Sequence, residues 1–232
     1  MTLTRRNLLT TAITAAGAAA LSVAAGGGTA AAATHPKLGP GSSGRAVLAL
    51  QVRLNALGYW LGVPDGKFGP LTTQAVLALQ SVAGLRRDGV VGPAAWAKID
   101  GGVRPRARTR VGNAIELNKA TQTLLVVSGG VVKAIYHIST GSGQRYYSRG
   151  AWHTATTPTG SYHVFRSVRG WDRGPLGSLY RPAYFSGGFA VHGALSVPPW
   201  PASHGCARVA VAAMDHLWAS GSIRVGSPVR VY

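Results

Sequence analysis

The apolar residues near the start of the segment 37–100 recur at the spacing of an α-helix. They lie three and four residues apart, at Val47, Leu50, Leu54 and Leu57. This spacing gives one apolar helix face. Ser43 stands where an N-cap residue is expected, and Gly58 stands where a helix C-terminus favours a left-handed residue.

An internal repeat predicts two further helices. Asp-Gly-Lys-Phe-Gly-Pro at 65–70 returns as Asp-Gly-Val-Val-Gly-Pro at 88–93, 23 residues later (88 − 65 = 23). In each copy Asp-Gly favours a turn, and Gly-Pro places a proline in the first turn of a helix. The sequence therefore predicts a small all-α three-helix bundle over residues 37–100.

The pattern changes after this bundle. Residues 101–111 contain two glycines, a proline and four arginines, with too few apolar side chains for a core. We interpret them as a solvated basic linker.

Residues 112–232 have the composition of strands. The β-branched runs 124–127 and 131–136 flank Ser128-Gly129-Gly130, which predicts a hairpin. Further strands are expected at 162–165, 189–191 and 229–232, one helix near 210–219, and glycine-rich loops at 141–150 and 169–178. The fold class is therefore multidomain: the helical bundle, then a mainly-β sandwich or barrel with a helix near its end.

The N-terminus predicts export. Arg5-Arg6 precedes a weakly apolar stretch from Leu8 to about Ala25, and small residues at 31–33 offer a cleavage site. We expect residues 1–33 to be a cleaved twin-arginine signal peptide rather than a membrane anchor, since threonines and alanines give little transfer energy. The mature chain would act outside the cell or in the cell wall.

The charge is strongly positive. Lys and Arg number 24 against six Asp and Glu, which gives a net charge of +18, or +16 without the two arginines of the signal peptide (18 − 2). Such a chain should bind polyanions, for example anionic wall polymers. Nucleic acid is the rival partner and is disfavoured by export and by the scattered basic residues. We expect a monomer with no stable membrane span.

Candidate chemistry centres on Cys206, the only cysteine. It has no disulfide partner in the chain and no companion thiols for a metal site. His192-Gly193 lies 14 residues earlier (206 − 192 = 14). Cys206 is either a buried structural residue or a nucleophile with a histidine base. As a nucleophile it would have Gly205 beside it to let substrate approach, and backbone amides of 204–206 to face an oxyanion.

No metal or cofactor is predicted. The mature chain has only six acidic residues, and none lies in a His-x-His or His-Glu pattern. Zinc catalysis is therefore disfavoured.

Aromatic and basic residues gather in the expected loops of the second module. Trp171 and Trp200 are the first candidates to stack on a substrate. Six arginines could meet substrate carboxylates, although a solvated surface is the simpler interpretation. They are Arg145, Arg149, Arg166, Arg169, Arg173 and Arg181.

The first module resembles the helical peptidoglycan-binding domain of many wall enzymes. The resemblance rests on Leu50-Gln51, Leu57-Gly58-Tyr59, Leu79-Gln80 and the two Asp-Gly-x-x-Gly-Pro segments. It implies binding to wall glycopeptide. The alternative is a spacer bundle that binds nothing.

The second module resembles the L,D-transpeptidases of the YkuD type. The residues are His192-Gly193, Ser203-His204-Gly205-Cys206-x-Arg208 and the preceding Thr157-Pro158-Thr159-Gly160. The resemblance implies Cys206 as nucleophile, His192 as proton donor and acceptor, and the Gly193 carbonyl as the group that orients His192. It places Ser203, His204, Gly205 and Arg208 at the substrate or the oxyanion.

The implied reaction is cross-linking of peptidoglycan stem peptides, 3→3, through a cysteine thioester. An L,D-carboxypeptidase on the same site and a non-catalytic wall-binding protein remain alternatives. A thiol peptidase of the NlpC/P60 type is disfavoured, because there the cysteine precedes the histidine.

Overall fold

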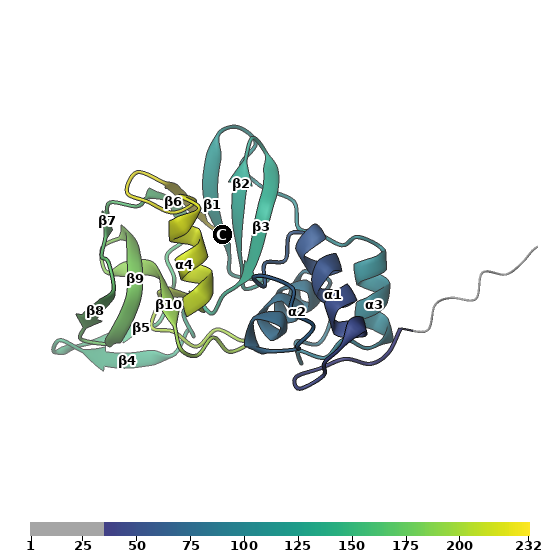
Figure 1. The fold of residues 1–232 in the computed structure, drawn as a ribbon. Helices are drawn as coiled ribbons and strands as arrows, with labels where there is room; N and C mark the ends of the chain where they lie inside the picture. Colours follow the sequence, from purple (N-terminus) through teal and green to yellow (C-terminus); the bar gives the residue numbers. More distant parts are fainter. Residues whose placement is uncertain (1–34) are drawn as a thin grey trace, which may run out of the picture. The chain divides into compact units, whose positions relative to one another are not determined.

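The computed structural model describes residues 35–232 (Figure 1). The signal peptide expected at 1–33 lies outside the described residues. Within residues 35–232, none of the helices has the length and apolarity needed to span a membrane.

The first module contains the three expected helices, α1 (Arg45–Ala56), α2 (Pro70–Val82) and α3 (Pro93–Asp100). Pro70 and Pro93 open their helices, and Gly58 follows the first helix with a φ of +85°. The expected cap at Ser43 is wrong: Gly44 is the N-cap, and Ser43 instead pairs with Lys67 in a short β-bridge.

Two buried glutamines explain the internal repeat. The Gln51 side chain accepts from the Gly66 amide and donates to Asp65 Oδ1 (2.8 Å for both bonds). Gln80 does the same in the second copy, with Gly89 at 2.9 Å and Asp88 at 2.7 Å. Each Asp-Gly turn is therefore held by a glutamine on a neighbouring helix.

The second module is a two-sheet β structure with one helix, as expected. The first sheet has the strand order β3-β2-β1-β12-β6, and the second has β11-β10-β9-β7 with β8 paired to β9. The strands of the first sheet are β1 (Asn113–Asn118), β2 (Thr123–Ser128), β3 (Val131–His137), β6 (Gly160–His163) and β12 (Pro228–Val231). Those of the second are β7 (Arg166–Ser167), β8 (Trp171–Gly174), β9 (Gly177–Ser186), β10 (Phe189–Ala194) and β11 (Ala207–Ala210).

The core of this module lies between the two sheets and α4 (Val211–Ala219). Leu124 from the first sheet, Val191 and Val209 from the second, and Met214 from α4 belong to one buried cluster. Helix α4 packs on the second sheet, along β10 (Figure 1). The helix and both sheets therefore support β10, which carries His192 and Gly193, and β11, which follows the loop of Cys206.

The two glycine-rich loops expected at 141–150 and 169–178 are partly strands. A separate hairpin joins β4 (Arg145–Ser148) to β5 (Ala151–Thr154), and β8 occupies the second segment. Both strands are mostly exposed, so they lack the apolar alternation that marks a half-buried strand.

The first sheet is buried on both faces along β2 and β3. Leu124 and Tyr136 face the core of the β module, whereas Leu125 and Ile135 belong to the core of the helical module. Backbone bonds join the modules here, from Trp60 N to Ile135 O (3.0 Å) and from Ile135 N to Gly58 O (2.8 Å). The modules therefore share a core.

The segment 101–111 has no helix or strand, but it is not the free solvated linker that we expected. Tyr59 Oη donates to the Val103 carbonyl (2.9 Å), and Arg104 donates to the Val132 carbonyl (2.6 Å). The Arg108 amide donates to the buried Glu116 carboxylate (2.9 Å). These bonds fix the segment to both modules, while its arginine side chains remain exposed.

Candidate active site

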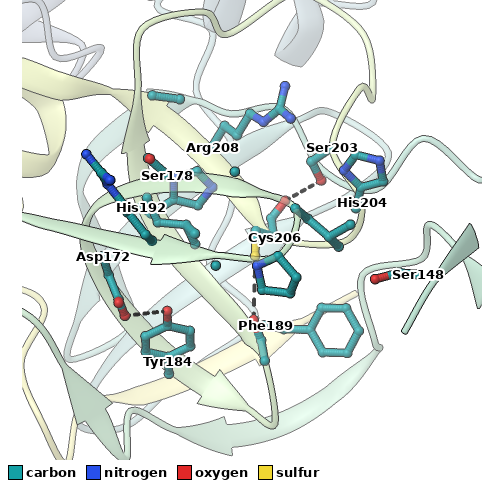
Figure 2. A pocket seen from close by; sticks show the side chains of 18 of the residues that line it. Ser148, Asp172, Ser178, Tyr184, Phe189, His192, Ser203, His204, Cys206 and Arg208 are labelled. Atoms are coloured by element: carbon teal, nitrogen blue, oxygen red, sulfur yellow. Dashed lines mark hydrogen bonds between the residues drawn. The ribbon is translucent and has the colours of Figure 1, made fainter. Parts of the chain in front are cut away.

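His192 lies on β10 of the second sheet, and Cys206 lies in the loop immediately before the neighbouring strand β11. β10 and β11 run parallel, and His192 is paired in register with Arg208, two residues after Cys206. Both residues line one cavity of about 880 Å³. Figure 2 shows Cys206 near the centre of this cavity, with His192 on one side and His204 on the other. The fold therefore brings together the thiol and the imidazole that the sequence singled out.

The imidazole of His192 is oriented by its own neighbour. Its Nδ1 lies 2.9 Å from the Gly193 carbonyl, so Nδ1 carries the proton that it donates and Nε2 is left for chemistry. Position 193 also has little room, because a Cβ there would lie 2.9 Å from Tyr180 Cδ1. The pKa of His192 is lowered to about 4, mainly by burial and also by the charge of Arg208, against the opposing effect of the bond to Gly193. The ring is therefore a neutral base near pH 7.

The thiol of Cys206 is protonated as well. Burial raises its pKa above the ordinary value, and a backbone bond and Arg208 oppose this only in part. The thiol donates to the Gly188 carbonyl, with Sγ 3.7 Å from the oxygen. Near pH 7 both side chains are therefore neutral, rather than a thiolate and an imidazolium.

Buried polar groups hold the loop that carries the sulfur. Ser203 Oγ donates to the Cys206 carbonyl (2.6 Å) and accepts from the Gly205 amide (3.0 Å). Thr157 Oγ1 donates to the Gly205 carbonyl (2.7 Å) and accepts from the Gly141 amide (3.0 Å). Thr157 is part of the motif quoted above, but sequence reasoning gave it no role.

Gly205 is not where we expected it. It is buried and does not line the cavity, so it offers no approach for a substrate. Its φ is +135°, and a Cβ would lie 2.4 Å from the Phe189 ring. Glycine is needed here for backbone conformation and packing.

The other three residues expected at the substrate do line the cavity. They are Ser203, His204 and Arg208. His204 is exposed and meets the Tyr146 ring edge-on, with 4.7 Å between ring centroids. Ser203 is almost fully buried, so its main contacts are those that hold the loop.

Most of the remaining wall comes from the two hairpins that the sequence did not reveal. Tyr146, Ser148 and Arg149 come from β4 and its turn, and residues 171–179 come from β8 and the start of β9. Trp171 lines the cavity, whereas Trp200 does not. Of the six loop arginines, Arg149, Arg166 and Arg173 line it, and Arg145, Arg169 and Arg181 do not.

The part of the chain that the structure describes contains no group of three His, Cys, Asp or Glu side chains arranged to hold a metal ion.

Comparison with known proteins identifies both modules. Residues 43–99 match the model of a putative peptidoglycan-binding domain, and residues 112–231 match the L,D-transpeptidase catalytic domain, YkuD. The second match covers more than half of the chain, which therefore belongs to the L,D-transpeptidase family.

A solved relative supports this assignment. The chain is similar to the L,D-transpeptidase from Xylanimonas cellulosilytica, with 46% identity over 84% of this chain and 97% of that one, and a TM-score of 0.82.

Curated relatives share shorter segments. An uncharacterised protein of Kitasatospora aureofaciens is 48% identical over 68 residues, which are 29% of this chain and 58% of that protein. The zinc D-Ala-D-Ala carboxypeptidase of Streptomyces albus G is 48% identical over 65 residues, 27% of this chain and 25% of that protein. The chain thus spans little more than half of one curated relative and a quarter of the other.

Proposed function

We propose that the protein is an exported, cysteine-dependent L,D-transpeptidase that forms 3→3 cross-links between peptidoglycan stem peptides. The observation that carries the proposal is that Cys206, in the loop just before β11, and a neutral, oriented His192 on the neighbouring strand β10 line the same cavity. The family explains the reaction type, and this pair supplies the nucleophile and the base.

The acyl donor is a tetrapeptide stem. Cys206 Sγ attacks the carbonyl of the third residue, an L-centred diamino acid, and His192 Nε2 takes the thiol proton. For this step the thiol exchanges its bond to the Gly188 carbonyl for one to the imidazole. His192 then protonates the leaving D-alanine nitrogen, so the C–N bond breaks and a thioester remains.

The oxyanion of this step is stabilised by backbone amides of the cysteine loop. The Gly205 amide already donates to Ser203, which leaves the amides of His204 and Cys206 as the donors of this segment. Arg208, two residues from the sulfur and also on the cavity wall, would contact the substrate.

Release of the acyl group decides the product. A side-chain amine of a second stem attacks the thioester carbonyl, and His192 takes the amine proton. The C–S bond then breaks, His192 returns a proton to the leaving Cys206 Sγ, and an amide cross-link remains. Attack by water instead would make the protein an L,D-carboxypeptidase. The peptidoglycan-binding module favours the first outcome, because it would hold the enzyme where stems are concentrated.

Mass spectrometry of the intact protein tests the nucleophile. A carbapenem should add one acyl group to the wild type and none to Cys206→Ala. With a disaccharide-tetrapeptide as substrate, accumulating dimers identify a transpeptidase, and tripeptides alone identify a carboxypeptidase.

Two histidine variants test the base. His192→Ala should lower the acylation rate at least about a hundredfold, as loss of a general base commonly does. His204→Ala is the matched control, since His204 lines the same cavity but is exposed. A larger loss for His204→Ala would show that the roles are reversed.

Export is tested separately. Arg5→Lys with Arg6→Lys should retain the protein inside the cell if residues 1–33 direct it through the twin-arginine route. Unchanged export of this variant would remove that part of the proposal.

A further inference from the structure

The wall of the cavity is cationic. Four arginines line it, with Asp172 as its one carboxylate among residues 35–232: Arg149, Arg166, Arg173 and Arg208. Asp172 already has two partners within the protein. Its Oδ2 lies 3.0 Å from Arg166 Nη2 and accepts a hydrogen bond from Tyr184 Oη at 2.8 Å. Within the part of the chain that the structure describes, the other three guanidinium groups have no carboxylate within 4.0 Å.

Two of these three arginines come from the hairpins that flank the sulfur. Arg149 lies in the turn between β4 and β5, and Arg173 lies on β8. Figure 2 shows their neighbours Ser148 and Asp172 on opposite sides of Cys206. Arg149 and Arg173, both exposed, therefore line the cavity from two different hairpins.

We propose that Arg149 and Arg173 make the site selective for stem peptides whose carboxylates are free, over stems in which those groups are carboxamides. The inference rests on the proposed function, since it takes stem peptides as the substrates. A guanidinium binds a carboxylate through two parallel charge-assisted hydrogen bonds, and a neutral carboxamide loses the charge and one acceptor. Because both arginines are solvent-exposed, each contributes a modest factor that salt reduces.

Two tetrapeptide stems that differ only in carboxylate against carboxamide test the proposal. The wild type should use the free-acid stem with a kcat/KM about tenfold higher at low ionic strength, and the preference should shrink as salt is added. The double variant Arg149→Gln, Arg173→Gln should lose most of this preference by losing activity on the free-acid stem. Arg169→Gln, an exposed arginine outside the cavity, should keep it. Equal rates on the two stems in the wild type would overturn the inference and leave the transpeptidase assignment intact.

A second measurement needs no turnover. Iodoacetate and iodoacetamide alkylate thiols and differ in the same way, carboxylate against carboxamide. The quantity to measure is the rate with iodoacetate divided by the rate with iodoacetamide, at Cys206 and at free cysteine. In the wild type this ratio should be several-fold higher at Cys206 than at free cysteine, and it should fall in the double variant. Arg208 is present in both proteins, so the difference reports the two hairpin arginines.

The two measurements separate the proposals. If iodoacetate is favoured at Cys206 but neither stem is turned over, the proposed function is contradicted, while selection of carboxylates by the two arginines is supported. A ratio equal to that of free cysteine would overturn the inference even if the protein cross-links stems.

Discussion

Two buried histidines, His137 and His192, make the stability of the protein depend on pH. Burial lowers the pKa of each to about 4, from 6.5. In the unfolded chain both bind a proton once the pH falls below 6.5, whereas in the folded protein they stay neutral down to about pH 4. The free energy of unfolding therefore decreases as the pH falls between these values. From pH 7 to pH 5 each histidine should remove about 2 kcal/mol, so the pair removes about 4 kcal/mol.

Urea unfolding at pH 7 and pH 5, followed by tryptophan fluorescence, measures this loss. For His137→Gln the free energy of unfolding should fall by only about 2 kcal/mol between pH 7 and pH 5, because one of the two histidines is gone. Glutamine keeps a donor for the Pro198 carbonyl, which His137 now contacts at 2.9 Å. His153→Gln, an exposed site on β5, should show the full wild-type loss. A wild-type loss below about 1 kcal/mol, or an unchanged loss in His137→Gln, would refute the argument that burial keeps these rings neutral.

Three further predictions follow from the site and the core. The rate at which iodoacetamide alkylates Cys206 should rise with pH to beyond 9, because burial raises the pKa of this thiol; a rate that stays level between pH 5 and 8 would instead indicate a thiolate–imidazolium pair. Gly205→Ala should lower the free energy of unfolding by about 3 kcal/mol, because alanine would be strained at this positive φ and would clash with the Phe189 ring. Gly188→Ala is the control: it has open space around it and should cost less than about 1 kcal/mol in the same urea titration. Removing residues 35–100 should leave a chain that does not fold, since Ile135 would lose the core it packs into; a folded, active product by circular dichroism and turnover would contradict this.

The elements with regular apolar spacing could be predicted from the sequence. The helix near 45–56 is confirmed, because its apolar side chains recur at the helical period. The hairpin around 128–130 is confirmed as well, because β-branched runs flank its Ser-Gly-Gly turn. The hairpins β4–β5 and β8–β9 could not be found in this way. Their strands β4 and β8 bury little, so neither Arg145–Ser148 nor Trp171–Gly174 carries a periodic signal.

Part of the candidate site could be predicted from the sequence, and part could not. The positions of Cys206 and His192 could be predicted as a pair, because a lone cysteine and a His-Gly segment stand out in the sequence and match a family motif. The position of Gly205 could not, because its need for glycine comes from the Phe189 ring, 16 residues away (205 − 189 = 16). The support from Thr157 to the cysteine loop spans 48 residues and likewise depends on tertiary structure.

One feature of the sequence indicates that a second layer covers the outer face of the first sheet. A strand with one solvated face alternates apolar and polar residues, whereas Leu124-Leu125-Val126-Val127 is continuously apolar, as in strands buried on both faces. The helical module covers the second face, where Leu125, Val127, Val132 and Ile135 are at most 6% exposed. Burial of four such side chains is worth about 2 kcal/mol each, or about 8 kcal/mol together, which is comparable to the net stability of a whole domain. The helical module is therefore part of the folding unit that holds Cys206 and His192 in place, in addition to any binding of the cell wall.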